Sequence, residues 1–251
     1  MTQLLTALQD GVLTLTLNRP DKRNALSTPM LEELGRALTS ADLDSTVRVV
    51  SIRGAGKDFC AGADLDELLA SADRTAEQNE ASALIMGNVF IQMRRLAKPV
   101  VAVVHGRVLA GGAGLATGCD LILAPESAQF GYPEIQRGFV PAIVMTMLKR
   151  LVGEKVAFDL AATGRVLSAP EAAGVGLISR VFAQAEFENG VDQVLKGLAA
   201  ASATALALTK KQFYQLDNTS FEDGIRMGAR VNALSRATPD FRTAIAAFLK
   251  R

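Results

Sequence analysis

Two turns built from small residues could present backbone N–H groups to a ligand. Gly111-Gly112-Ala113-Gly114 follows a predicted strand and opens a predicted helix, and Cys60-Ala61-Gly62-Ala63-Asp64 precedes a second helix start. Unpaired N–H groups at such places favour negative charge, and little side chain covers them here. Two donors that converge on one oxygen would stabilise an oxyanion or enolate, each contributing about 3–4 kcal/mol. The two turns therefore form one site only if the fold brings them together.

The turn at Gly111 does not match the common nucleotide-binding patterns. A dinucleotide fingerprint counted from Gly112 and Gly114 needs a third glycine where this chain has Thr117. A phosphate-binding loop ends in Lys followed by Ser or Thr, and no such pair follows here. Two interpretations stay open for this turn: close packing permitted by glycine, and N–H donation to an anionic group.

The composition describes a chain that can build a full core without cross-links. Of its 251 residues, 49% are apolar and 21% are charged, which excludes a disordered chain, and the net charge of +1 does not suggest a nucleic-acid partner.

The longest apolar run, Ala244 to Leu249, has six residues, whereas a membrane helix needs about twenty. With only Cys60, Cys119 and His105 available, we expect no metal site and a reducing compartment. No signal peptide is recognisable, so the expected location is the cytoplasm.

The elements that must hold the turns follow from hydrophobic periodicity. Apolar alternation or continuous apolar runs predict strands at 12–17, 47–52, 100–104 and 120–124. Thr28-Pro29 predicts a helix start, with Thr28 as the cap and with Met30, Leu34 and Leu38 on one face. After Val181 the pattern is almost wholly helical, over 184–200, 203–216, 220–235 and 239–250. We therefore expect an α/β chain that ends in a run of helices.

Segments along nearly the whole chain resemble the enoyl-CoA hydratase/isomerase (crotonase) family. They are Asn18–Leu26, Asp58–Leu65, Val104–Asp120, Ala128–Gly138 and Thr163–Ile178, in order and with fitting spacing. The resemblance implies an α/β fold, a crotonase-like spiral of ββα units over residues 1–195 that carries an acyl-CoA site. It further implies a C-terminal helical region over residues 196–251 that assembles trimers, or hexamers made of two trimers. Coenzyme A would enter as part of an acyl-CoA thioester substrate, with no separate cofactor.

The resemblance also assigns roles to particular residues. It places the backbone N–H groups of Ala63 and Gly111 in an oxyanion hole and gives the Glu134 carboxylate the proton transfer. Residues expected around the substrate are Lys22, Arg23, Ala25, Leu26, Ala61, Asp64, Leu65, Gly112, Gly114, Tyr132 and Pro133. Of these, Lys22, Arg23, Ala25 and Leu26 would lie near the nucleotide part of CoA. Core packing is the alternative for Tyr132.

The resemblance fails at one position: where the two-glutamate hydratases of the family have their first glutamate, this chain has Gly114. Asp66 is a candidate replacement, against the simpler interpretation of a solvated residue in a first helical turn. Some hydratase-like members, similar to methylglutaconyl-CoA hydratases, also carry glycine there. We therefore predict hydration of the 2,3 double bond of an enoyl-CoA. The alternatives are a Δ3,Δ2-enoyl-CoA isomerase with Glu134 as its single base and a non-catalytic acyl-CoA-binding relative.

Overall fold

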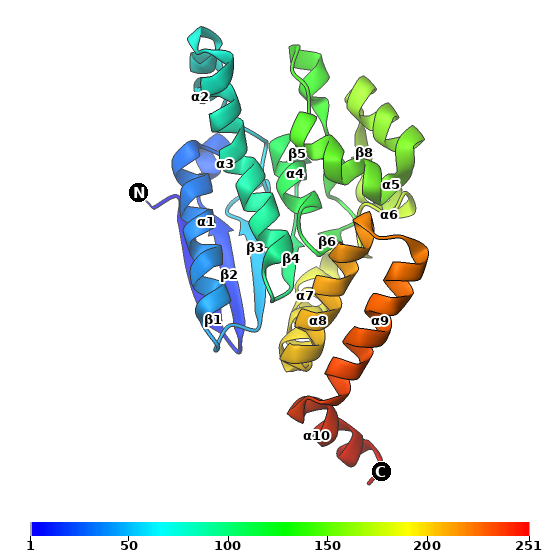
Figure 1. Cartoon of the computed structure of the whole chain (residues 1–251). Helices are drawn as coiled ribbons and strands as arrows, with labels where there is room; N and C mark the ends of the chain where they lie inside the picture. Colours follow the sequence, from blue (N-terminus) through cyan, green and yellow to red (C-terminus); the bar gives the residue numbers. More distant parts are fainter. Residues whose placement is uncertain (1, 251) are drawn as a thin grey trace.

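The computed structural model describes residues 2–250, which form two β-sheets surrounded by helices (Figure 1). The larger sheet has the strand order β1-β2-β3-β4-β6-β9. Its strands are β1 (Leu4–Gln9), β2 (Val12–Leu17), β3 (Val49–Gly54), β4 (Val100–Val103), β6 (Leu121–Pro125) and β9 (Arg180–Phe182). Strands β1 and β2 are antiparallel and the other neighbours in this sheet are parallel. The predicted strands in 12–17, 47–52, 100–104 and 120–124 are confirmed within two residues.

A second sheet of three short strands lies beside the first. It consists of β5 (Arg107–Leu109), β7 (Gln129–Gly131) and β8 (Val166–Ser168), in the order β5-β7-β8. In one unit, strand β4 belongs to the larger sheet, β5 belongs to the smaller sheet, and helix α4 (Gly111–Thr117) follows. The next unit has the same order, with β6, β7 and α5 (Ala142–Thr163). This repetition is the predicted spiral of strand–strand–helix units, and it delivers α4 and β7 to the same region.

Helices cover both faces of the larger sheet. In Figure 1, α1 (Thr28–Leu43) and α3 (Ala76–Arg95) lie in front of it, and α7 (Phe187–Ala200) packs on the opposite face. Val50 and Ile52 of β3 enter the main core, whereas Val49 packs with Phe187 and Val191 of α7. Parallel strands that are buried on both faces explain the continuous apolar runs in the sequence.

Two helix starts lie at the edges of the site. Ser27, not the predicted Thr28, caps α1, because its hydroxyl accepts from the Met30 N–H. Asp64 caps the short helix α2 (Leu65–Ala70) by accepting from the N–H groups of Asp66 and Glu67. The start of α2 agrees with the sequence prediction, and the cap of α1 is displaced from it by one residue.

The C-terminal helices are α8 (Ala203–Gln215), α9 (Phe221–Arg236) and α10 (Pro239–Phe248), and α9 and α10 extend away from the sheets (Figure 1). Lys210 attaches α8 to the core: its buried Nζ lies 2.6 Å from Asp120 Oδ2 and donates to the Met93 carbonyl at 2.8 Å. Within residues 2–250 no single helix is long and apolar enough to cross a membrane. Only the segments 184–200 and 203–218, bent by 101° against each other, meet the length and composition criteria as a pair.

Candidate active site

The structure brings the two small-residue turns together. Cys60 pairs with Val108 in an isolated parallel bridge, and the Leu109 N–H donates to the Cys60 carbonyl at 3.0 Å. A Cβ built on Gly111 would lie 3.4 Å from the backbone nitrogen of Ala63. The backbones of residues 63 and 111 are therefore direct neighbours, although 47 positions of sequence separate them.

Two N–H groups at this junction have no hydrogen-bond partner within residues 2–250. Among the described residues, neither the Ala63 nor the Gly111 N–H donates a hydrogen bond. The chain around Ala63 is held by the Leu26 N–H, which donates to Gly62, and by the Asp64 N–H, which donates to Leu26. Gly111 opens α4, where N–H groups have no partner within the helix. Two unpaired donors side by side can hold one anionic oxygen.

Close backbone approach explains the small residues of the two turns. A Cβ on Gly112 would come within 2.6 Å of three Cys60 atoms, and a Cβ on Gly62 would lie 2.7 Å from the Ala110 Cβ. Ala110 itself has φ +50° and ψ −128°, a conformation that costs an L-residue about 1–3 kcal/mol. The fold therefore holds a strained backbone where the N–H donors are presented, and Gly112 serves packing against Cys60.

Glu134 lies in a 3-10 turn, Pro133–Arg137, directly after β7. Its side chain is buried, with 8% of the residue exposed, and Oε2 has no hydrogen-bond partner among the described residues. Burial raises the pKa of Glu134 above its ordinary value, while its own backbone N–H and Arg137 act to lower it. A buried carboxylate with a free oxygen and a raised pKa has the properties of a general base.

The position of the missing glutamate is filled by apolar groups. A Cβ on Gly114 would lie 2.5 Å from Val144 Cγ2 and 3.5 Å from Phe90 Cζ. Val144 belongs to α5 and Phe90 to α3, and both are buried. Asp66 does not replace the carboxylate, because its side chain is 82% exposed and pairs with Lys22 Nζ at 3.0 Å. The solvated interpretation of Asp66 is therefore the correct one.

Tyr132 precedes the turn of Glu134 and is wholly buried. Its hydroxyl lies 2.6 Å from the Thr117 hydroxyl, which in turn donates to the Ala113 carbonyl. The ring packs edge-on against Phe130, and Pro133 beside it is buried too. Tyr132 therefore belongs to the core, where it links α4 to the start of the Glu134 turn.

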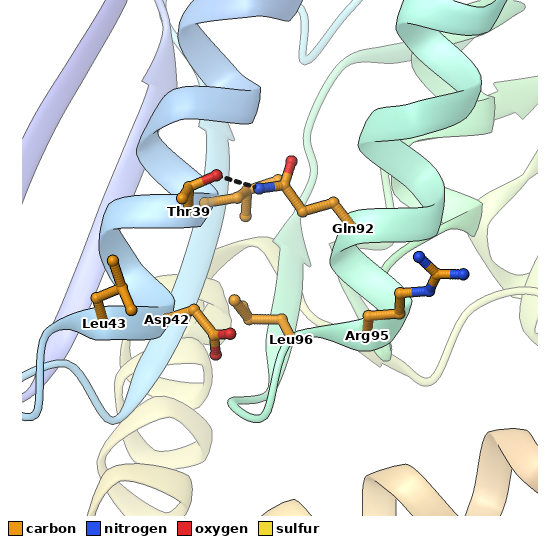
Figure 2. Close-up of a pocket in the computed structure, with 7 residues that line it drawn as sticks. Thr39, Asp42, Leu43, Gln92, Arg95 and Leu96 are labelled. Carbon is orange, nitrogen blue, oxygen red and sulfur yellow. Dashed lines mark hydrogen bonds between the residues drawn. The ribbon is translucent and has the colours of Figure 1, made fainter.

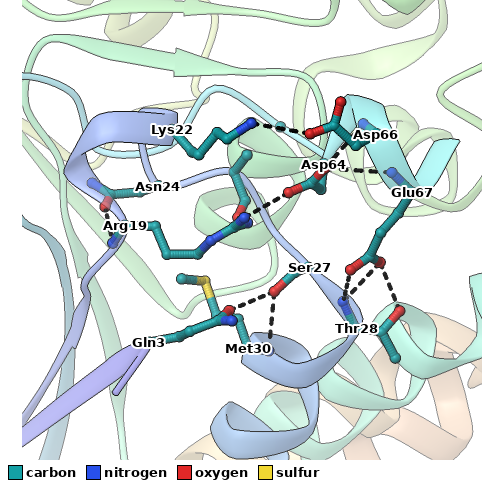
Figure 3. Close-up of polar contacts among 12 residues, drawn as sticks. Gln3, Arg19, Lys22, Asn24, Ser27, Thr28, Met30, Asp64, Asp66 and Glu67 are labelled. Carbon is teal, nitrogen blue, oxygen red and sulfur yellow. Dashed lines mark hydrogen bonds and ion pairs between the residues drawn. The ribbon is translucent and has the colours of Figure 1, made fainter. Parts of the chain in front are cut away.

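The N-terminal segment Asn18–Leu26 packs against the turn Cys60–Asp64 (Figure 3). Arg19 donates to the Ala25 carbonyl and pairs with Asp64 Oδ2, both at 2.7 Å. Burial acts to raise the pKa of Asp64, but Arg19 and the α2 N–H groups outweigh it, so that the pKa is lowered. The Asp64 carboxylate thus binds both the start of α2 and the Arg19 side chain.

The other predicted substrate contacts of this region differ in exposure. The side chains of Lys22 and Arg23 are 58% and 60% exposed and project from the surface, where basic groups can pair with phosphates. Leu65 is exposed, and Ala25 and Ala61 are half-buried. Leu26 is buried, so its contribution lies in its backbone pairing with the Ala63 segment.

Asn24 ties this segment to the turn after β3. Its buried Oδ1 accepts from the Arg19 N–H at 2.9 Å, and Nδ2 donates to the carbonyl oxygens of Ala55 and Asp58, each at 2.8 Å. Its φ of +55° is one that asparagine tolerates better than most residues. Asn24 lies in the segment that resembles the family, but the sequence alone predicts no role for it.

We expect Asn24→Asp to destabilise the fold strongly. The change preserves size but turns two donors into acceptors that face two carbonyl oxygens. Leaving buried groups unpaired costs about 1–3 kcal/mol each, and more with a charge, so the free energy of unfolding should fall by at least about 3 kcal/mol. Urea unfolding measures this loss. The same substitution at Asn189, which is exposed on α7, is the control, and equal losses at the two positions would contradict the role given to Asn24.

A pocket of about 170 Å³ between α1 and α3 lies outside the candidate site (Figure 2). Its lining residues are Leu38, Thr39, Asp42, Leu43, Gln92, Arg95 and Leu96. Gln92 Nε2 bridges its walls by donating to the Thr39 hydroxyl at 2.6 Å. None of these residues contacts the two turns or Glu134 in the interactions described above.

Comparisons with known proteins cover the segments that form this site. The family described as Enoyl-CoA hydratase/isomerase matches residues 7–251. A Thermus thermophilus protein named "Putative enoyl-CoA hydratase" is 40% identical over 240 residues, 96% of this chain and 95% of that protein. The peroxisomal Delta(3,5)-Delta(2,4)-dienoyl-CoA isomerase of Arabidopsis thaliana is 32% identical over 94% of this chain and 89% of its own length. A crystal structure of an enoyl-CoA hydratase from Mycobacterium smegmatis has a TM-score of 0.95 at 35% identity, covering 100% of this chain and 97% of that one.

Proposed function

The chain belongs to the enoyl-CoA hydratase/isomerase family of enzymes, and from that premise we propose that it adds water to the 2,3 double bond of an enoyl-CoA thioester. The proposal rests on the neighbouring N–H groups of Ala63 and Gly111 and on the buried Oε2 of Glu134, none of which has a hydrogen-bond partner among the described residues. These groups meet the two needs of the reaction, which are a place for the enolate oxygen and a group that moves protons.

In the proposed reaction the thioester oxygen accepts hydrogen bonds from Ala63 and Gly111. This polarisation makes C3 of the acyl group electrophilic. As the oxygen of water bonds to C3, a water proton passes to the Glu134 carboxylate, and the electrons of the double bond move into an enolate held by the two N–H groups. Protonated Glu134 then returns the proton to C2, so that the product contains one added water and the enzyme is unchanged.

The second candidate function is isomerisation of a 3-enoyl-CoA to a 2-enoyl-CoA. It is favoured by the apolar wall at Gly114, where Val144 and Phe90 stand in place of a second carboxylate. In that reaction Glu134 would take a proton from C2 and return it to C4, and no water would be needed. Both candidates use the same oxyanion hole.

A panel of acyl-CoA substrates with mass analysis of the products tests the proposal. Hydration raises the product mass by one water, whereas isomerisation leaves the mass unchanged and moves the double bond. An unchanged mass for every 2-enoyl-CoA, with turnover of 3-enoyl-CoAs, would overturn the proposal in favour of the isomerase. Tight acyl-CoA binding with no product from any enoyl-CoA would favour a non-catalytic binding protein.

The rate should fall on the acid side of the pH range at a pH above the ordinary titration of a glutamate. A base must be ionised to accept a proton, and burial raises the pKa of Glu134. We therefore expect kcat/KM to decline, in proportion to the ionised fraction, as the pH falls through that raised pKa. A pH–rate profile measures it, and a profile that stays flat down to about pH 4.3, the ordinary value for glutamate, would contradict the role of Glu134.

We also propose that residues 196–251 assemble the protein into trimers, or into hexamers of two trimers. The support is a set of large apolar side chains on the C-terminal helices, each at least 38% exposed. They are Phe213, Leu216, Phe221, Ile225, Leu234, Phe241, Ile245, Phe248 and Leu249. Exposed apolar surface of this extent marks an interaction site. Light scattering at micromolar concentration should give the mass of a trimer or hexamer, and a monomeric mass would contradict the proposal.

Within the same proposal, the protein works in the reducing environment of the cytoplasm. Its two cysteines, Cys60 and Cys119, are free and buried. Burial raises the pKa of the Cys60 thiol to about 12, so this side chain stays neutral and serves as a small packing group.

We assign coenzyme A to the substrate and propose no further cofactor.

A further inference from the structure

We propose that Val144 is a specificity-determining residue. With Phe90, it packs where the Cβ of any side chain on residue 114 would lie, so that this position holds glycine and the one carboxylate that we propose for the reaction is that of Glu134. This inference rests on the proposed acid–base role of Glu134. It holds for hydration and for isomerisation alike, because both would use that group.

Residue 114 lies in α4, the helix that Gly111 opens. It lies three positions after Gly111, and residues at this spacing share one face of a helix. A side chain at position 114 would therefore leave α4 near the face that carries Gly111. The main-chain geometry alone would allow an acidic group to act there, next to a thioester held by Ala63 and Gly111.

Val144 closes this space with one methyl group. The Cβ of any side chain at position 114 would lie 2.5 Å from Val144 Cγ2, a separation that real Cβ atoms do not show. The next Val144 atom, Cβ, would be 3.7 Å away, which is an ordinary contact. The conflict is therefore with the γ-methyl alone, and truncation of Val144 to alanine would remove it.

The methyl group has little freedom to move aside. Val144 lies in the first turn of α5, is 2% exposed and packs in the main core, as does Phe90 at 5%. A valine in a helix keeps one strongly preferred χ1 rotamer. Leu148, one turn further along α5, is fully buried and holds the helix against the core. The packing of Val144 in this place thus requires a residue without a Cβ at position 114.

The chemical consequence is an asymmetric site. Glu134 brings a buried carboxylate oxygen without a partner among the described residues, whereas Val144 Cγ2 and Phe90 Cζ are the groups next to position 114. These apolar groups cannot carry a proton, so we assign the proton transfer to Glu134. Substrates whose reaction needs a second acid or base from the enzyme would be turned over poorly.

The packing part of the proposal is tested by a cycle of Gly114→Ala, Val144→Ala and the double variant. Overpacking should lower the Tm of Gly114→Ala by about 3–10 °C. The double variant should lose less than the two single variants together, because the methyl that collides is gone. Gly87→Ala is the matched control: Gly87 also lies inside a helix, α3, but its added Cβ would meet nothing within 4 Å, so its Tm should not fall. Equal Tm values for Gly114→Ala and Gly87→Ala, or strict additivity in the cycle, would overturn the proposal.

The chemical part is tested by Gly114→Glu combined with Val144→Ala, on the substrate that the wild type turns over best. The wild type and Val144→Ala should show one ionisation on the acid side of the kcat/KM profile, whereas the combined variant should show a second one. A folded combined variant that keeps a single ionisation, or that has no activity, would overturn the proposal. If the combined variant does not fold, the alanine cycle decides. A wild type that isomerises and does not hydrate would refute the proposed function, and the same profiles would still decide the role of Val144.

Discussion

Replacing Glu134 by glutamine is expected to lower kcat/KM by about 10²–10⁴, the usual contribution of general acid–base catalysis. Glutamine has the size and hydrogen-bonding reach of glutamate but cannot accept the proton. The two positions weighed for a second carboxylate do not supply one: position 114 is a glycine packed against Val144, and Asp66 is exposed and paired with Lys22. Acyl-CoA affinity should change little, because the residues expected near the nucleotide part of CoA lie in another segment, 22–26. Steady-state kinetics on the best substrate of the panel measures the loss.

The same substitution should leave the fold intact and make it somewhat more stable at neutral pH. Burial raises the pKa of Glu134 in the folded state above its unfolded value. Ionised Glu134 therefore destabilises the native state above that folded pKa, and this penalty disappears as the pH falls below the unfolded pKa. Glutamine carries no charge, so its variant should have an equal or higher Tm at neutral pH. Glu126→Gln, in an exposed turn after β6, is the control. Full activity in folded Glu134→Gln would refute the mechanism.

Replacing Gly111 by valine is expected to lower kcat by about 10²–10³, the typical effect of losing one oxyanion donor. The new Cβ would lie 3.4 Å from the Ala63 nitrogen and 3.6 Å from Met86 Sδ, and the two methyl groups would extend from there. They would crowd the space in front of both N–H groups, where the thioester oxygen must sit. An alanine at this position should cost less, since its single Cβ is in ordinary contact distance of its neighbours.

The control for this variant is Gly197→Val, because an added Cβ at the exposed Gly197 of α7 would meet no atom within 4 Å. Both variants should fold, as judged by circular dichroism and Tm. Wild-type turnover in folded Gly111→Val would place the oxyanion site elsewhere in the molecule.

The sequence predicted the larger sheet better than the smaller one. Strands such as β2 and β4 carry clear apolar patterns, whereas β5, β7 and β8 have three residues each and are too short to show a period. Strand β1 also escaped prediction, because only Leu4 of its six residues is buried and no alternation results. Helix α5 is interrupted at Gly153, where φ is +76°, and no segment was predicted for it.

The parts of the site that depend on local sequence were predictable, and the parts that depend on packing between distant segments were not. The small-residue turns stood out by composition, and the resemblance assigned Glu134, whose burial only the fold could provide. Val144 and Phe90 lie in helices without any motif, and their relation to Gly114 exists only in three dimensions. The resemblance implies a glutamate at position 114 in the two-glutamate hydratases, and the glycine found there does not indicate which side chains pack against it.

The most direct test of the central claim is deuterium exchange at C2 of a saturated acyl-CoA in D₂O. The claim is that Glu134 moves a proton at this carbon while Ala63 and Gly111 hold the enolate oxygen, and a saturated substrate isolates that step from hydration and from double-bond movement. Mass analysis should show the wild type incorporating deuterium at C2, with exchange slowed by about 10²–10⁴ in Glu134→Gln and by about 10²–10³ in Gly111→Val. Equal exchange in wild type and Glu134→Gln, or no exchange in a wild type that binds the acyl-CoA, would contradict the account.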